Sequence, residues 1–243
     1  MRNTAIFLFL FFLYLAPLAA QNEMQFYKAF RTDRYEGGHA VIKGFHRNYV
    51  IAGVIVDRTD GEDFILANFD LQGKLLWAKN YGSYYTEQGE GVWLANTFDG
   101  GMVFGGHSWN KGRAVLVKVD KYGTILYSYA EAFGGLSTST KGIPLEDGST
   151  LVSGYSRSVK DSLQLSKQQL LKLDMNGNVL WRKQTEGNGW GYVCKNLTIG
   201  SGSLLSSGYT SDGVNEHAYL MKNDSIGNNL WAFRYEGAEN TRI

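Results

Sequence analysis

An internal repeat of about fifty residues constrains the fold of this chain more than any other feature. Each copy contains the pattern D-x-x-G-x-x-L followed by an aromatic residue. The four copies are FDLQGKLLW (69–77), VDKYGTILY (119–127), LDMNGNVLW (173–181) and NDSIGNNLW (223–231). A repeat of this length predicts one small structural unit, built four times, that buries its apolar face by stacking on its neighbours.

A second block precedes each copy and ends at a glycine that follows a small residue. Its four versions are NYVIAG (48–53), GMVFGG (101–106), STLVSG (149–154) and SLLSSG (203–208). Insertions fall between the two kinds of block, where loops are expected. The small residue before the glycine suits a place where neighbouring sheets approach each other closely.

Each repeat divides into four short apolar stretches that are rich in β-branched and aromatic residues. In the second repeat they are GVWLANTF (91–98), GMVFGGHSW (101–109), RAVLVKVD (113–120) and ILYSYAEAF (125–133). Such stretches predict β-strands. In the D-x-x-G connection the aspartate can accept backbone N–H groups and the glycine can take a positive φ, so a tight hairpin turn is expected there.

Four antiparallel strands per unit predict an all-β fold, a β-propeller of four-stranded, WD-like blades with about four repeats present. A β-sandwich does not explain the fixed period, and a β-solenoid usually has shorter repeats. Segment 160–174 shows some helical spacing, but we expect a loop that runs into a strand. An aromatic column is expected to wedge between blades and to be largely buried; it comprises Trp77, Tyr127, Trp181 and Trp231.

The D-x-x-G-x-x-L-W patterns and the glycine blocks resemble the repeats of secreted quinoprotein-like (PQQ-like repeat) β-propellers over residues 24–243. The resemblance implies the scaffold. Quinone-dependent dehydrogenases of that kind carry a longer A-x-D-x-x-T-G-x-x-x-W pattern, a vicinal cysteine pair and a calcium site near the axis. Here the spacing from aspartate to tryptophan is one residue shorter, and Cys194 is the single cysteine. The resemblance therefore brings no cofactor to this chain.

The repeats predict blade boundaries and raise the question of ring size. The blades are expected at 24–82, 83–134, 135–187 and 188–237, with 238–243 opening a further repeat. Segment 25–31 (QFYKAFR) matches a fourth-strand block, so it reads as the last strand of a preceding unit. Either the four blades close alone, or the chain is part of a larger ring of six to eight or so blades, which we favour.

The first twenty residues read as a secretory signal peptide (1–20), followed by a mature chain of 21–243. Arg2 precedes an apolar run from Ala5 to Ala16, and small residues precede Gln21. The run is shorter than the roughly 20 residues that span a membrane, although an uncleaved anchor is the alternative. The whole chain has 24 basic and 23 acidic residues. A nearly neutral chain has no general attraction to nucleic acid or anionic membranes.

The histidines and the cysteine form no recognisable catalytic or metal-binding pattern. His39 and His46 flank the expected first strand, seven residues apart, which is unlike a metal pair. His107 and His217 read as packing or surface residues, and Cys194 as a small buried residue. The segment GHSWN (106–110) approaches a nucleophile elbow but lacks its second glycine and its helix.

An acidic connection, DRTDGED (57–63), holds Asp57, Asp60, Glu62 and Asp63. These carboxylates could supply some of the six to eight or so oxygens that calcium needs, but a solvated hairpin between two strands is the favoured interpretation. Asn196 and Asn223 begin N-x-S/T sequences, which matter only if the host glycosylates exported proteins.

A regular scaffold with variable loops and no catalytic pattern favours a secreted binding module for a protein or glycan ligand. The alternative is a propeller enzyme, glycan-active or redox, whose residues come together from several blades. The sequence assigns no catalytic, cofactor-binding or metal-ligating residue. We expect no cofactor, no nucleic-acid partner and no membrane span after removal of the signal.

Overall fold

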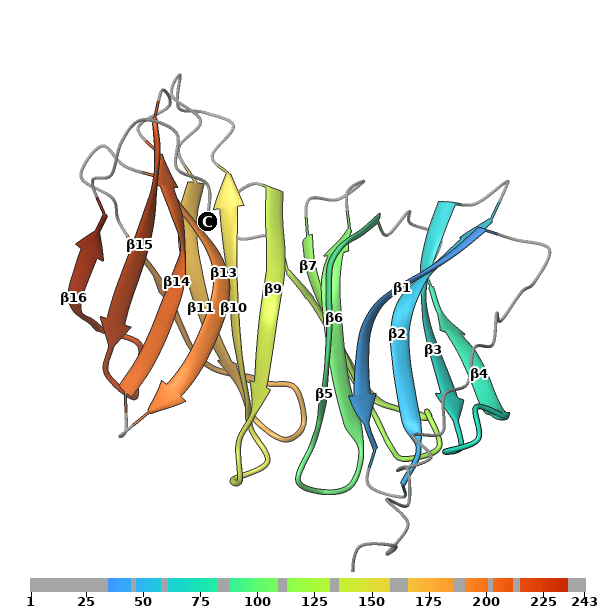
Figure 1. Cartoon of the computed structure of the whole chain (residues 1–243). Coiled ribbons are helices and arrows are strands. Elements are labelled where there is room, and N and C mark those ends of the chain that lie inside the picture. The colour runs from blue at the N-terminus through green and yellow to red at the C-terminus, as the bar shows by residue number, and fades with distance from the viewer. Residues whose placement is uncertain are drawn as a thin grey trace, which may run out of the picture. The chain divides into compact units, whose positions relative to one another are not determined.

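The computed structural model describes residues 35–44, 47–57, 61–82, 88–108, 113–131, 136–157, 166–185, 191–200, 203–211 and 215–235. All of them belong to one compact unit, residues 31–243. Within these ranges the chain forms four antiparallel sheets of four strands each (Figure 1). This arrangement confirms the all-β architecture of four-stranded blades.

The strands of every sheet pair in chain order. The first sheet contains β1 (Tyr35–Lys43), β2 (Tyr49–Asp57), β3 (Gly61–Phe69) and β4 (Leu75–Tyr81). The second contains β5 (Gln88–Asn96), β6 (Met102–Ser108), β7 (Arg113–Val119) and β8 (Ile125–Glu131). The third contains β9 (Leu136–Pro144), β10 (Thr150–Arg157), β11 (Ser166–Leu173) and β12 (Val179–Gln184). The fourth contains β13 (Gly191–Gly200), β14 (Ser203–Ser211), β15 (Glu216–Asn223) and β16 (Asn229–Arg234).

The strands expected in the second repeat are all present, as β5 to β8. The end of segment 160–174 forms β11, which confirms that this segment runs into a strand; residues 158–165 lie outside the described ranges. In the described part of the chain, no helix is long and apolar enough to cross a membrane. Residues 1–34, with the expected signal peptide and segment 25–31, also lie outside the described ranges.

The D-x-x-G segments form the predicted turns between the third and fourth strands. Oδ1 of Asp70 accepts the backbone N–H groups of Gln72 and Lys74, at 2.9 and 2.8 Å. Gly73 closes the turn with a φ of 72°. The other three turns repeat this geometry, with aspartates 120, 174 and 224 and positive-φ glycines 123, 177 and 227.

In the first and third sheets, the glycine that ends the second block faces an irregular first strand of its own sheet. The pairing of β1 with β2 skips His39, between Gly38 and Ala40. A β-carbon at Gly53 would lie 2.0 Å from the carbonyl oxygen of Gly37. A β-carbon at Gly154 would lie 1.9 Å from the carbonyl oxygen of Thr138. At these two glycines the close approach lies within one sheet, where the first strand is irregular. At Gly106 of the second sheet it lies between neighbouring sheets, because a β-carbon there would lie 2.9 Å from Cε1 of Phe64 in the first sheet.

Three of the four residues of the aromatic column lie between sheets, where each ring packs on a turn glycine of the following sheet. A β-carbon at Gly177 would lie 2.6 Å from Cδ2 of Tyr127. Equivalent contacts join Trp77 to Gly123 and Trp181 to Gly227. Most of the surface of each of these three residues is buried, as expected, and the remainder is exposed at the outer edge of the sheet.

Trp231, the fourth member of the column, is 43% exposed, so the expectation that it is largely buried is wrong. Its counterparts are covered by the turn of the next sheet, and the described residues place no further turn over Trp231. The wedge role predicted for the column is confirmed at three junctions and is absent at this position.

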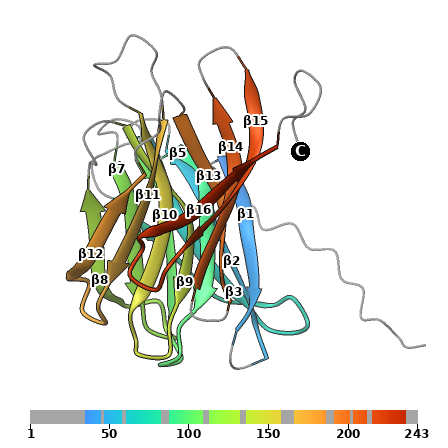
Figure 2. The ribbon, with the colours of Figure 1, turned by 90° about the vertical axis from the view of Figure 1, so that its left-hand side faces the viewer.

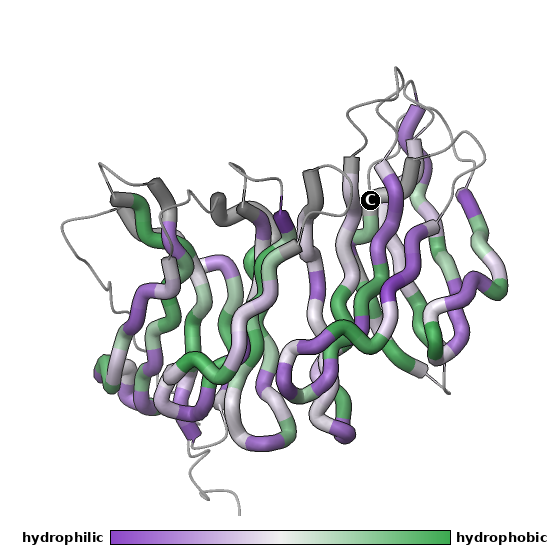
Figure 3. Tube along the Cα trace, turned by 180° about the vertical axis from the view of Figure 1, so that it is seen from behind, coloured by the Kyte–Doolittle hydropathy of each residue, from purple (hydrophilic) through white to green (hydrophobic). Residues whose placement is uncertain are grey.

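Apolar clusters fill the spaces between consecutive sheets, which lie side by side in chain order (Figure 1). The first junction joins Leu66 and Phe64 to Phe104 and Val117, and the other two have clusters of their own. Hydrophobic stretches run along the strands of all four sheets (Figure 3). The stacking of adjacent units around shared cores is therefore as the repeat predicted.

Candidate functional site: a groove between the third and fourth sheets

The two ends of the sheets differ in regularity. One end, the turn end, carries the D-x-x-G turns and the connections between the first and second strands. The other end, the loop end, carries the connection between the second and third strands of each sheet. It also carries the connections from one sheet to the next. Those between second and third strands differ in length: they span 58–60, 109–112, 158–165 and 212–215.

A groove of about 370 Å³ lies between β12 of the third sheet and β15–β16 of the fourth. This volume lies within the range of roughly 300–1,000 Å³ that is usual for small-molecule sites. Six of its nine lining residues have polar side chains. It is lined by Lys183, Gln184, Thr185, Met221, Asn223, Gly227, Asn228, Asn229 and Ala232.

The groove exists because a small residue takes the place of a tyrosine. At the first junction, Tyr81 occupies the corresponding space: its hydroxyl donates to the carbonyl oxygen of Gly123 at 2.7 Å. Its ring also packs on Phe104, with centroids 5.1 Å apart. The repeat places Thr185 at the equivalent position of the third sheet. The shorter side chain leaves the space between the outer strands open.

The floor of the groove carries a buried acceptor with no donor. Oγ1 of Thr185 donates to Sδ of Met221 at 3.7 Å and ties the two sheets together. Asn223 is 1% exposed, and its Nδ2 donates to the carbonyl oxygen of Gly227 at 3.2 Å. Its Oδ1 is buried and has no hydrogen-bond partner among the described residues. A buried polar atom of this kind costs about 1–3 kcal/mol, so a ligand that donates to it would be favoured.

Asn223 is itself a departure from the repeat. The second and third sheets carry Val119 and Leu173 at this position, and both are fully buried in apolar clusters. An asparagine here gives up apolar packing and places a carboxamide at the bottom of the groove. The exchange makes sense where the groove holds a polar ligand.

The groove walls carry both hydrogen-bond donors and hydrogen-bond acceptors. Lys183 and Gln184 lie on the β12 side, while Asn228 and Asn229 lie on the side of the β15–β16 turn. Nδ2 of Asn228 donates to Oδ2 of Asp224 at 2.9 Å. Desolvation would raise the pKa of Asp224, but hydrogen bonds from Asn228 and Ile226 and the charge of Lys183 lower it. An ionised Asp224 therefore fixes the Asn228 carboxamide beside the groove.

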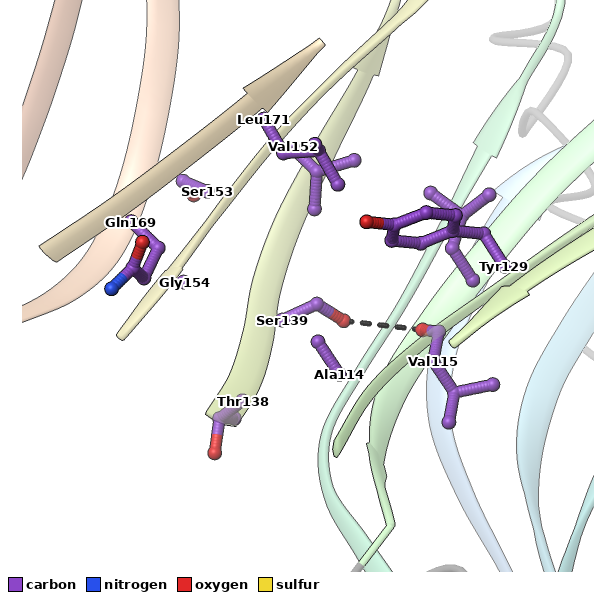
Figure 4. Close-up of a pocket in the computed structure, with 11 residues that line it drawn as sticks. Ala114, Val115, Tyr129, Thr138, Ser139, Val152, Ser153, Gly154, Gln169 and Leu171 are labelled. Carbon is purple, nitrogen blue, oxygen red and sulfur yellow. Dashed lines mark hydrogen bonds between the residues drawn. The ribbon is translucent and has the colours of Figure 1, made fainter. Parts of the chain in front are cut away.

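A second cavity, between the second and third sheets, is much smaller, about 20 Å³ (Figure 4). Tyr129, Ser139 and Gln169 line it together with apolar side chains. Its volume suits a single water molecule and excludes a substrate-sized ligand. Oγ of Ser139 accepts from Nε1 of Trp93 at 3.1 Å and lies 2.9 Å from the carbonyl oxygen of Gly106. These bonds tie β5, β6 and β9 together.

The structure places the histidines apart. His39 is exposed and lies inside β1 at its bulge, which corrects its expected place beside the strand. His107 is buried, with Nδ1 2.9 Å from Oγ1 of Thr138. His217 lies in β15, and His46 lies outside the described ranges. Among the residues that the structure describes, no three His, Cys, Asp or Glu side chains gather as a metal site.

The structure also bears on the cysteine, the acidic connection and the two N-x-S/T sequences. Cys194 is fully buried, as expected. In the acidic connection, residue 60 and the side chains of Asp57 and Glu62 lie outside the description, but β2 and β3 flank it as an antiparallel hairpin. Asn223 is buried on the groove floor, so the folded protein does not expose it for glycosylation. The side chain of Asn196 is not described.

Comparison with known proteins shows the fold. No family model and no curated protein sequence matches the chain. Drosophila Semaphorin 1a, extracellular domains 1–2, matches with a TM-score of 0.51 at 7% identity, over 78% of this chain and 41% of that one. A subtype N10 neuraminidase-like protein of A/little yellow-shouldered bat/Guatemala/060/2010 matches with a TM-score of 0.49 at 13% identity, over 77% of this chain and 54% of that one.

An acylaminoacyl peptidase of Pyrococcus horikoshii also matches, with a TM-score of 0.48 at 11% identity, over 81% of this chain and 32% of that one. The chain spans about half or less of the length of these proteins. The four sheets of four antiparallel strands, together with the match to the semaphorin domains, show that this chain has β-propeller architecture. At these identities the similarity shows the fold alone.

Proposed function

We propose that this protein is an exported β-propeller module that binds a hydroxyl-rich ligand, a glycan, in the groove between its third and fourth sheets. The observation that carries the proposal is the unpartnered Oδ1 of Asn223 on the floor of a polar groove. Of the two ligand classes that the sequence favours, protein and glycan, a glycan fits this lining better. Its hydroxyl groups both donate and accept, as the carboxamides of the groove do.

The groove suits a small part of such a ligand. About 370 Å³ is near the lower end of the usual range for small-molecule sites, enough for one or two sugar rings. A ligand hydroxyl donating to Oδ1 of Asn223 would satisfy the buried acceptor. The ammonium of Lys183 and the amides of Gln184 and Asn229 then offer further hydrogen bonds at the walls. The set favours a neutral or acidic sugar.

The sharpest test fills the groove in the way the first junction is filled. Thr185→Tyr places a tyrosine where Tyr81 stands in the first sheet, within reach of the turn glycine as Tyr81 is. We expect a folded protein that no longer binds. The probes are a panel of neutral and acidic disaccharides, followed by saturation-transfer NMR on the parent chain and on the variant.

The controls separate a blocked groove from a damaged fold. Thr185→Ser keeps the groove open and keeps a hydroxyl near Met221, so its binding should equal that of the parent. Asn223→Leu restores the apolar residue of the third sheet, and it should weaken binding while raising stability. Binding of disaccharides by the Thr185→Tyr variant would contradict the proposal. A matched panel of short peptides tests the protein-ligand alternative.

Export is the second part of the proposal and rests on the apolar run after Arg2. The expected product begins at Gln21. Mass spectrometry of the N-terminal peptide from secreted material tests this directly. A product that begins at Met1 would contradict the signal-peptide interpretation.

A further inference from the structure

Each sheet has two faces, and the contacts between sheets identify them. The forward face packs on the following sheet; in the first sheet it carries Val50, Leu66 and Trp77. The rear face packs on the preceding sheet; in the second sheet it carries Leu94 and Phe104. Every junction in the described chain therefore joins the forward face of one sheet to the rear face of the next.

The forward face of the fourth sheet also carries large apolar residues, but no other described sheet covers it. At one position of this face the first three sheets carry Leu66, Leu116 and Leu170, which are 0%, 2% and 2% exposed. The fourth sheet carries Leu220 there, and it is 43% exposed. Trp231 and Phe233 lie beside it on β16, at 43% and 63% exposure. Figure 2 views this side of the molecule, with no other described sheet in front of β16.

The rear face of the first sheet is open at two matching positions, on β1 and β2, whereas Ile55, Ile65 and Ala67 on the same face are buried. Val41 of β1 is 64% exposed, whereas Leu94, its counterpart in β5, is 6% exposed and packs against the first sheet. Ile51 of β2 is half-buried, whereas its counterpart Phe104 is fully buried. The pairing registers establish both equivalences, since Val41 pairs with Ile51 and Leu94 pairs with Phe104.

We propose that the forward face of the fourth sheet docks on the rear face of the first sheet of a second copy of this chain. The chain carries both halves of a contact that it already makes three times internally, so a second copy supplies the complementary surface. Two copies joined head to tail at both ends bring together eight sheets. That number lies within the four to eight or so blades typical of closed propellers, so we expect a dimer and not an open filament.

The experiment measures association of the chain by sedimentation velocity over about a hundredfold range of concentration. We expect a concentration-dependent dimer. Leu220→Glu places a charge on the forward face, and Val41→Glu places one on the rear face. Each variant should be monomeric, because either charge interrupts both of the equivalent junctions of a symmetric dimer. Phe98→Glu is the matched control: Phe98 is also exposed, at 62%, but lies in the β5–β6 turn and should leave the dimer intact.

Mixing the two variants tests the head-to-tail geometry itself. The Leu220→Glu copy keeps its rear face and the Val41→Glu copy keeps its forward face, so a mixture can form one intact junction. We expect heterodimers, at least about tenfold weaker than the parent dimer, from two chains that do not self-associate. Recovery of association also shows that both variants are folded. A parent chain that stays monomeric, variants that still dimerise, or a mixture that does not associate would each overturn the proposal.

Discussion

Trp181 of the third sheet lies so close to Gly227 of the fourth that a β-carbon on the glycine would fall 2.8 Å from its ring atom Cζ3. The aromatic residue and the turn glycine are only four positions apart in each copy of the repeat. In the second and third copies the glycine contacts the preceding sheet and the aromatic residue contacts the following sheet. The D-x-x-G-x-x-L-aromatic pattern thus reflects contacts between sheets as well as the turn within each sheet. Several measurable consequences depend on it.

Replacing a turn glycine should cost more where a ring lies over it. Gly177 and Gly100 have nearly the same positive φ, 87° and 84°, but only Gly177 has an aromatic ring within contact of a β-carbon. Gly100→Ala should lose about 1 kcal/mol of unfolding free energy from backbone strain alone. Gly177→Ala should lose about 2–4 kcal/mol, since Tyr127 must also move. Urea denaturation measures both losses. Equal losses would show that the contact with Tyr127 does not add to the cost of the substitution.

Two tryptophans of the same column should differ in their contribution to stability. Trp181 is half-buried against Gly227, so Trp181→Ala should lose about 2–3 kcal/mol, below the value for a fully buried aromatic residue. Trp231→Ala removes a side chain that is 43% exposed, and should lose less than about 1 kcal/mol in the monomer. Thermal melts at low protein concentration compare them. A larger loss for Trp231 than for Trp181 would contradict this account of the junctions.

The turn end should lose stability in acid through Asp147. Hydrogen bonds from the hydroxyl and N–H of Ser149, together with Lys172 at 3.1 Å, lower the pKa of Asp147 to about 2. Because the folded pKa lies below the unfolded value, the stabilisation is present above about pH 4 and is lost as the pH falls toward 2. Asp147→Asn should flatten the pH dependence of the melting temperature in that window. Glu146→Gln, at an exposed neighbour, is the control and should leave the pH dependence unchanged.

Tyr81 should make the first junction sensitive to alkali. Burial, with a smaller effect from Asp120, raises the pKa of Tyr81 well above its usual value. The stabilisation is therefore present below about pH 10 and is lost as the pH rises beyond it. Tyr81→Phe should cost about 1 kcal/mol at neutral pH, because the hydrogen bond to Gly123 is lost, and should reduce the alkaline loss. Melts of this variant and of Tyr122→Phe, whose ring is exposed, at neutral and alkaline pH check both effects.

The repeat predicted the strands and the turns because both depend on neighbouring residues. Asp70 and Gly73 make their turn within five residues, so the pattern alone reveals it. The degree of burial was harder to predict. The burial of Trp231 depends on whether a neighbouring sheet covers it, and the local sequence around Trp231 does not show this.

The groove was missed because it arises from substitutions within aligned repeats and not from a motif. Thr185 in place of the tyrosine found at 81, and Asn223 in place of Val119 and Leu173, are both visible once the copies are superposed. The aligned copies alone do not show that these two positions line the same groove between the third and fourth sheets. The Trp93–Ser139 bond was hidden for the same reason, since its partners belong to different repeats.

The pairing of every sheet in chain order also bears on how the protein reaches its folded state. Each hairpin closes over a short stretch of chain, so the loop-closure entropy of a single sheet is small. The contacts across junctions come from residues about fifty positions apart. They stabilise the chain only after both of the sheets that they join have formed. Hydrogen exchange should accordingly reveal separate cooperative units, one per sheet. The first and fourth sheets should open more readily than the two between them, because each packs on only one other described sheet.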